Sequence, residues 1–248
     1  MSKALRSTLI GVAVAVVIVV AVLSPVMWRA ARLAFAKASI RRMLGSLTVQ
    51  EQQNLNATPT LIFLPSPQLN DGSTQIFTIG RYAIQVPKPI AYATISKSLE
   101  LTYARFHIII LPPSDVLEGD SLARQLNFKN YFALEDAAYH SRPADINSQS
   151  DMDALTREQA LIEIKLQIVD AALTQCFEEF DRGNLRGFIL GPNHNALNSP
   201  TIVELSVRDP NVVTGIWFSA NGRVRMPADD IHQFLSVLEV SAEPPKKP

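Results

Sequence analysis

An uninterrupted apolar run near the amino terminus constrains this chain more than any other feature. Residues 9–23 (LIGVAVAVVIVVAVL) contain no polar side chain, and the segment from Leu9 to Trp28 is 20 residues long. An α-helix of that length rises about 30 Å, which matches the hydrocarbon core of a bilayer. We therefore expect a tail over residues 1–7 and one transmembrane helix over residues 8–28, in a plasma membrane or a bacterial inner membrane.

A cleaved signal peptide is the alternative to a retained anchor. The segment Ala34-Phe35-Ala36 matches the small-x-small pattern of a cleavage site. That segment lies well past Leu23, however, and Arg29 and Arg32 stand between the two. The sequence therefore favours an anchor that stays on the protein.

The charged residues divide the chain into a basic head and an acidic body. The 248 residues include 23 Lys+Arg and 23 Asp+Glu, for a net charge of zero. Seven of the basic residues and none of the acidic ones lie in residues 1–42, so the remainder has a net charge of −7. This distribution is typical of a protein that contacts membrane lipids, and it argues against nucleic acid as a partner.

Residues 29–45 are predicted to form a basic amphipathic helix beside the membrane. Apolar residues recur there at three- and four-residue steps from Leu33 to Leu44. In one interpretation this helix lies on anionic headgroups, and in the other it continues the anchor helix through solvent. The residues that would face the membrane are Trp28, Arg29, Arg32, Lys37, Arg41 and Arg42.

The side of the membrane on which the rest of the chain lies is open. More Lys and Arg follow the apolar run than precede it, which favours a cytoplasmic domain. A short basic tail before an apolar run, here with Lys3 and Arg6, is also typical of an anchor whose domain is exported. The charge count gives the cytoplasmic side a slight preference.

The remaining residues predict a connector over 46–74, one α+β domain over 75–240 and a polar tail over 241–248. Strand patterns come first, three helices follow between residues 120 and 173, and an antiparallel meander leads to a closing helix after Pro227. We expect helices packed on a mostly antiparallel sheet, as an α-β-α sandwich. Nine residues are predicted to share one core: Val203, Leu205, Val207, Ile216, Phe218, Ile231, Phe234, Leu235 and Leu238.

This order of elements resembles the PsbP-like α-β-α sandwich family. The resemblance includes a strand that ends in a Val-Pro step, Tyr82–Pro87, and continues through Phe177–Phe218 and the closing helix Ile231–Val240. It covers about residues 75–240 and rests on element order. It implies a non-catalytic accessory or binding module, without fixed active-site residues to carry over.

Two segments supply candidate ligand-binding residues. The loop over residues 191–200 contains Asn193, His194 and Asn195, whose side chains can hydrogen-bond a polar ligand. A single strand is predicted over Leu101–Leu111, with Arg105 and His107 on one face, where they can bind an anion.

The search for catalytic or metal-binding signatures leaves one local pair. Asp136 and His140 are four residues apart on a predicted helix, but a metal site would need further ligands, and an exposed helix pair is the simpler account. Cys176 is interpreted as a buried structural thiol. We expect no catalytic residue, metal or cofactor.

Three functions are compatible with these observations. The first is a membrane-anchored accessory, scaffolding or binding module, whose partners are membrane lipids or a membrane protein. The second is an unrecognised hydrolase or metal-assisted enzyme. The third is a domain that binds a small ligand or a lipid.

Overall fold

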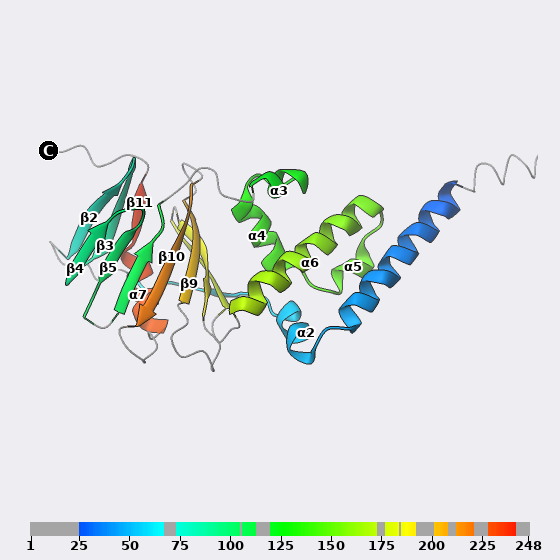
Figure 1. The fold of residues 1–248 in the computed structure, drawn as a ribbon, viewed down its shortest axis with the longest axis horizontal. Helices are drawn as coiled ribbons and strands as arrows, with labels where there is room; N and C mark the ends of the chain where they lie inside the picture. Colours follow the sequence, from blue (N-terminus) through cyan, green and yellow to red (C-terminus); the bar gives the residue numbers. More distant parts are fainter. Residues whose placement is uncertain are drawn as a thin grey trace, which may run out of the picture.

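The fold consists of a helical body and a sheet body, which lie side by side along the long axis of the molecule (Figure 1). The computed structural model describes residues 25–66, 73–104, 106–112, 120–172, 177–183, 185–191, 201–207, 212–220 and 228–241. No helix within these ranges is long and apolar enough to cross a membrane, and most of the predicted span over residues 8–28 lies outside them. The fold class is α+β, as predicted.

The helical body is built around one long helix. Its members are the helix over residues 25–45, α2 (Val49–Asn56), α3 (Asp120–Gln125), α4 (Tyr131–His140), α5 (Asp145–Ser148) and α6 (Met152–Ala172). Two faces of α6 are buried, as its wide apolar stripe predicts: Leu155 and Ile162 pack towards α2 and α5, and Leu161 and Ile164 pack towards α3 and α4. Thr48 and Glu51 form a capping box at the start of α2.

The amphipathic helix over residues 25–45 turns its apolar stripe towards α5 and α6. Ile40 is buried there together with Ile146 and Leu155. Two of the basic residues expected at the membrane contact the same part of the protein: Lys37 donates to the Asn147 carbonyl (2.9 Å), and Arg41 donates to its side-chain oxygen (3.0 and 2.6 Å). The stripe is therefore occupied by protein in this structure.

An eight-stranded sheet forms the centre of the sheet body. Its strands, in spatial order, are β1 (Thr60–Ile62), β7 (Phe177–Arg182), β8 (Leu185–Leu190), β9 (Thr201–Val207), β10 (Val212–Ala220), β6 (Phe106–Ile110), β5 (Leu99–Thr102) and β4 (Tyr92–Ile95). The pair β1–β7 is parallel, and the other neighbours are antiparallel. The expected connector thus contributes both α2 and an edge strand.

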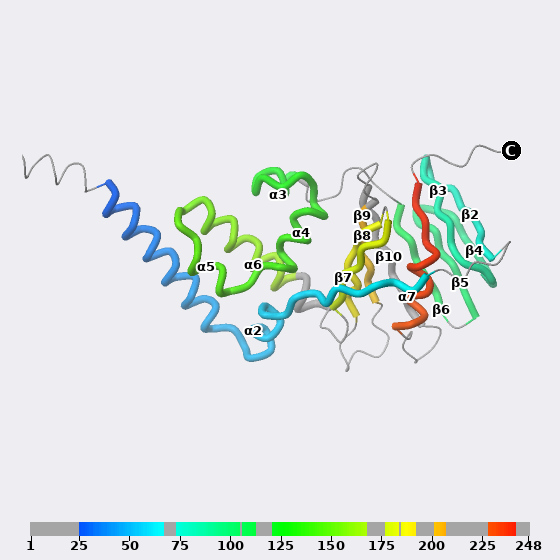
Figure 2. The backbone as a smooth tube through the Cα atoms, turned by 180° about the vertical axis from the view of Figure 1, so that it is seen from behind, coloured from blue at the N-terminus to red at the C-terminus, as the bar shows by residue number. Residues whose placement is uncertain are grey.

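A three-stranded sheet and one helix cover one face of this large sheet. The order is β11 (Glu239–Ser241), β3 (Tyr82–Pro87) and β2 (Thr74–Ile79), and α7 (Ala228–Val237) lies beside them (Figure 2). The second sheet was not expected. Six predicted core residues share the apolar cluster between these layers: Val203, Leu205, Ile231, Phe234, Leu235 and Leu238. The side chains of Val207, Ile216 and Phe218 lie outside the described set.

The prediction of a single strand over Leu101–Leu111 is wrong. The chain reverses after β5, and the Tyr103 amide donates to the Phe106 carbonyl (2.8 Å), so that β5 and β6 form a hairpin. An aromatic contact explains why this reversal is stable: the rings of Tyr103 and Phe106 stack with centroids 4.7 Å apart. The alternation of polar and apolar residues continues through the turn between β5 and β6, so the sequence pattern alone does not reveal the turn.

Candidate functional site

The predicted ligand-binding residues are only partly placed by the structure. Arg105 and the loop residues Asn193, His194 and Asn195 lie outside the described residues, as does Cys176. His107 is half-buried on β6, and its Nδ1 atom lies 3.2 Å from the Thr102 hydroxyl. Only His107 of this set is described, so the set stays a prediction.

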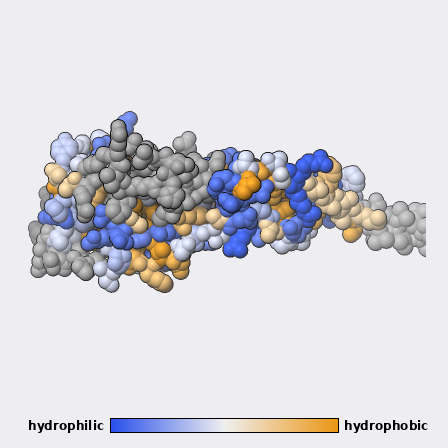
Figure 3. Space-filling view, turned by 90° about the horizontal axis from the view of Figure 1, so that it is seen from below, coloured by the Kyte–Doolittle hydropathy of each residue, from blue (hydrophilic) through white to orange (hydrophobic). Residues whose placement is uncertain are grey.

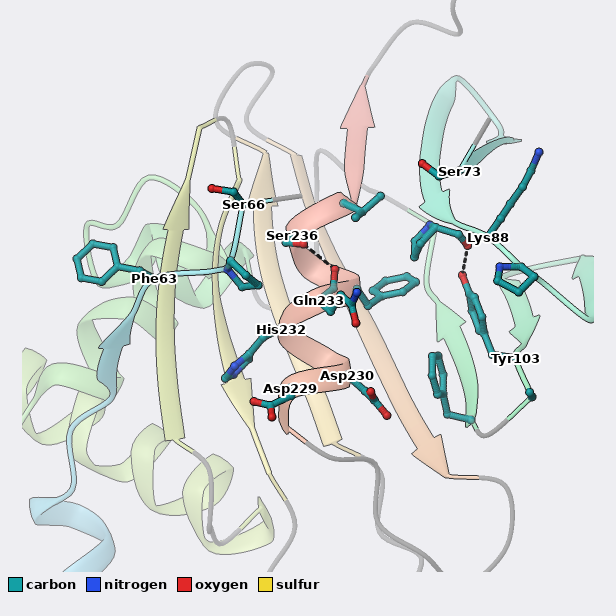
Figure 4. Close-up of a pocket in the computed structure, with 17 residues that line it drawn as sticks. Phe63, Ser66, Ser73, Lys88, Tyr103, Asp229, Asp230, His232, Gln233 and Ser236 are labelled. Carbon is teal, nitrogen blue, oxygen red and sulfur yellow. Dashed lines mark hydrogen bonds between the residues drawn. The ribbon is translucent and has the colours of Figure 1, made fainter. Parts of the chain in front are cut away.

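A groove of about 710 Å³ lies over the outer face of α7 (Figure 4). Its walls come from residues 63–66, from Ser73 before β2, from the Pro87–Pro89 connection after β3 and from the β5–β6 turn. Ser66 and Ser73 stand on opposite sides of α7 in Figure 4. A volume in this range is typical of sites for small molecules.

The groove combines an aromatic wall with polar groups. Tyr103 stacks on Phe106 and meets Phe234 edge-on, with centroids 6.2 Å apart. Its hydroxyl donates to the Pro87 carbonyl (2.8 Å), and burial raises the pKa of Tyr103, so it stays a donor. Phe63 is 89% exposed at the rim. The Ser73 hydroxyl is buried and has no hydrogen-bond partner among the described residues.

Polar residues of α7 complete the groove. Asp229, Asp230 and Gln233 line it, and Lys88 stands across from them. His232 also lines the groove, and its Nε2 atom lies 2.7 Å from the Glu178 carboxylate of β7. Within the described ranges no hydroxyl or thiol bonds to the other ring nitrogen of His232.

A second polar group surrounds the Asp136–His140 pair on α4, on the other face of the sheet. Glu179 of β7 joins it, and one ligand atom from each of the three residues lies within 4.8 Å of the others. Such a spacing can suit a metal ion. Arg186 of β8, however, donates to Asp136 (2.9 Å) and to Glu179 (2.7 Å).

The imidazole of His140 also faces both carboxylates. Its Nδ1 atom lies 3.4 Å from Asp136, and its Nε2 atom lies 3.2 Å from Glu179. The guanidinium of Arg186 already bonds to both carboxylates that a metal ion would need. We therefore assign these four residues as an ion-pair network rather than a metal centre.

A third polar group lies deeper in the same interface. Glu135 of α4 is 5% exposed, and its carboxyl group lies close enough to that of Glu204 on β9 for the two charges to interact. Burial, and then the charge of Glu204, raise the pKa of Glu135 to about 9. Burial also raises the pKa of Glu204, against hydrogen bonds from Tyr139 and Glu135 that lower it. Tyr139 donates to Glu204 over 2.7 Å.

Lys165 is a buried cation that the helical body uses for itself. Its side chain is fully buried, and its Nζ atom donates to the carbonyls of Ala57 (2.6 Å) and Ser141 (2.8 Å). These two residues cap the C-terminal ends of α2 and α4. Burial, and then Arg142, lower the pKa of Lys165 to about 8. Lys165 therefore links three helices and is not offered to a ligand.

Comparison of the chain with protein-family models, curated proteins and solved structures found no match in any of the three. The likeness to the PsbP-like family therefore stays a prediction from element order. Function has to be argued from the chemistry of the groove and of the two polar groups.

Sequence reasoning missed the residues that line the groove and the Glu135–Glu204 pair. One signal was present for the second: Tyr131, Glu135 and Tyr139 are spaced four residues apart, so they share a helix face. The strand partner Glu204 carries no such signal, because it alternates with apolar residues like any outward-facing position.

Proposed function

We propose that this protein is a membrane-anchored, non-catalytic binding module whose groove over α7 takes a small ligand with an aromatic or otherwise apolar body. The observation that carries the proposal is the groove itself. It offers an aromatic wall together with the carboxylates of Asp229 and Asp230.

The shape of the molecule supports a module held away from a membrane. The helix over residues 25–45 lies at one end of the long axis, and α7, which lines the groove, lies in the sheet body towards the other end (Figures 1 and 2). Trp28 is 66% exposed and Phe35 is 78% exposed on that helix. The surface at this end is mainly apolar and gives way to a strongly hydrophilic zone (Figure 3). An anchor at this end leaves the groove open to solvent.

Ligand-observed NMR tests the binding function. Full-length protein in nanodiscs is screened against neutral and basic aromatic fragments by saturation transfer. Gln233→Trp places an indole over α7 and should abolish the signals that depend on the groove. Phe63→Ser removes the rim aromatic and should weaken binding about tenfold, roughly 1.4 kcal/mol. Both side chains are exposed, so neither change disturbs the core.

Phe35→Ser is the matched control, because Phe35 is an exposed aromatic residue far from the groove. It should bind the fragments as the unaltered protein does. Fragments that bind equally well to Gln233→Trp, or a complete absence of bound fragments, would contradict the proposal. The anchor is tested separately, since removal of residues 1–24 should release the protein from membranes extracted with carbonate.

A further inference from the structure

The contact between the helical body and the sheet runs through α4. Phe132 and Tyr139 of this helix pack on Phe188 of β8, with ring centroids 5.6 and 4.8 Å apart, and Leu190 joins them. Glu135, which is 5% exposed, lies one helical turn before Tyr139, whose hydroxyl donates to Glu204 of β9 over 2.7 Å. Aromatic packing and a carboxyl pair thus meet in one interface.

The carboxyl pair has no described cation to neutralise it. Arg186 is engaged by Asp136 and Glu179, and His140 faces the same two carboxylates. On the opposite side of α4, Lys165 of α6 binds backbone carbonyls, and Glu158 accepts from Ser141.

The other titratable groups that face the pair are tyrosines. Tyr131 and Tyr139 of α4 border it, and burial raises the pKa of both, so each stays a neutral hydroxyl. Two ionised carboxylates in contact, without a cation, are costly to bury. The pair therefore has to hold a proton.

We propose that Glu135 and Glu204 form a proton-binding site that holds α4 on the eight-stranded sheet, so that loss of the shared proton loosens the joint between the helical and sheet bodies. This inference goes beyond the proposed function, because neither the groove nor a ligand takes part. A charge left between α4 and β9 would oppose the aromatic packing that keeps the bodies together.

The protonation state is measured by ¹³C NMR of full-length protein in nanodiscs, labelled at the glutamate carboxyl carbon. Two resonances should titrate well above those of exposed glutamates. Each should disappear from the spectrum of Glu135→Gln or Glu204→Gln. Glu163→Gln is the matched control, because Glu163 is exposed on α6 and binds only Gln159 among the described residues. Ionisation of every glutamate by pH 6 would overturn the proposal.

The joint is measured by hydrogen exchange of the α4 amides, corrected for the chemical rate. Above the pKa of the pair, protection of residues 131–140 should fall up to tenfold per pH unit for each proton released. Residues 228–237 of α7 should show no such loss. Glu135→Gln should keep α4 protected at every pH, and Glu163→Gln should behave as the unaltered protein does.

If the protection of the α4 and α7 amides depended equally on pH, the pair would not control the joint, even if it binds a proton. If Glu135→Gln does not fold, Glu204→Gln takes its place. The comparison of α4 with α7 in the unaltered protein decides the question without any variant.

Discussion

On one face of the eight-stranded sheet, α7 and the three-stranded sheet bury apolar side chains, whereas on the other face α4 brings carboxyl and hydroxyl groups onto the strands. Successive residues of β8 show the contrast: Leu185 and Ile189 enter the apolar cluster, and Arg186 points to Asp136 and Glu179. The apolar face holds its layers together at any pH, while the polar face depends on the charges of a few groups.

The two faces of the sheet therefore have different structural roles. The apolar face fixes α7, whose outer side forms the groove, so the groove is built on a helix that the main apolar cluster holds in place. The polar face carries the helical body, which in our proposal leads to the anchor. A change at α4 can therefore alter how the bodies are joined without reshaping the groove.

Truncation of Leu235 should produce the largest loss of stability. Leu235 is fully buried between the sheets, and Leu235→Ala should lower the free energy of unfolding by about 2–5 kcal/mol. Urea denaturation followed by near-UV circular dichroism measures it. Gln233→Ala on the exposed side of the same helix should stay within about 0.5 kcal/mol. A loss below 1 kcal/mol for Leu235→Ala would contradict the apolar account of this face.

The pH dependence of stability should report the polar face. Glu135 has a folded pKa of about 9, above its ordinary value of 4.5, so the folded protein keeps a proton that the unfolded chain releases. The resulting stability is complete below pH 4.5 and is lost as pH rises through about 9, by up to about 1.4 kcal/mol per pH unit. Urea midpoints at pH 5, 7 and 8.5 measure this slope.

The Leu235→Ala variant sharpens the comparison of faces. Because Leu235 and Glu135 lie on opposite sides of the sheet, Leu235→Ala should shift the whole curve downwards and leave its slope unchanged. Glu135→Gln should flatten the slope instead. A flat curve for the unaltered protein would show that the polar face is not charge-dependent.

The buried lysine of the helical body should act in the opposite direction. The folded pKa of Lys165 is about 8, below its ordinary 10.5, so the folded protein loses this proton first and stability rises with pH between these values. In Glu135→Gln, where the opposing slope is absent, the gain from pH 8 to 9.5 should be about 1–2 kcal/mol. The double variant with Glu135→Gln and Lys165→Met should lack this gain in stability. If the gain persisted, another titratable group would be its source.

Local periodicity predicted most single elements of this fold. Apolar spacing predicted three helices between residues 120 and 173, where α3, α4 and α6 form, and a closing helix after Pro227, where α7 begins at Ala228. Strand patterns were also expected before residue 120, and β2 and β3 form there on either side of Gly80, whose positive φ of 57° suits a tight turn. These features depend on residues that are close in sequence, so they can be predicted from one sequence alone.

Contacts between distant segments were not predictable in the same way. The pairing of β1 with β7 joins residues more than a hundred positions apart, and nothing in Thr60–Ile62 names its partner. The candidate site has the same problem: Glu179 and Arg186 reach Asp136 only because β7 and β8 pass beneath α4. Polar strand residues in a sequence look alike whether solvent or a helix covers them.

The smallest expected effect concerns the ion-pair network at the rim of α4. The His140 side chain is 44% exposed, so His140→Gln should cost less than about 1 kcal/mol, and 0.5 M salt should erase most of that cost. Thermal melts in low and high salt measure it. The same melts with added Zn²⁺ separate the network from a metal centre, because Arg186 already occupies both carboxylates. A melting temperature that rises with Zn²⁺ in the unaltered protein, but not in His140→Gln, would show that the three residues prefer a metal to the guanidinium.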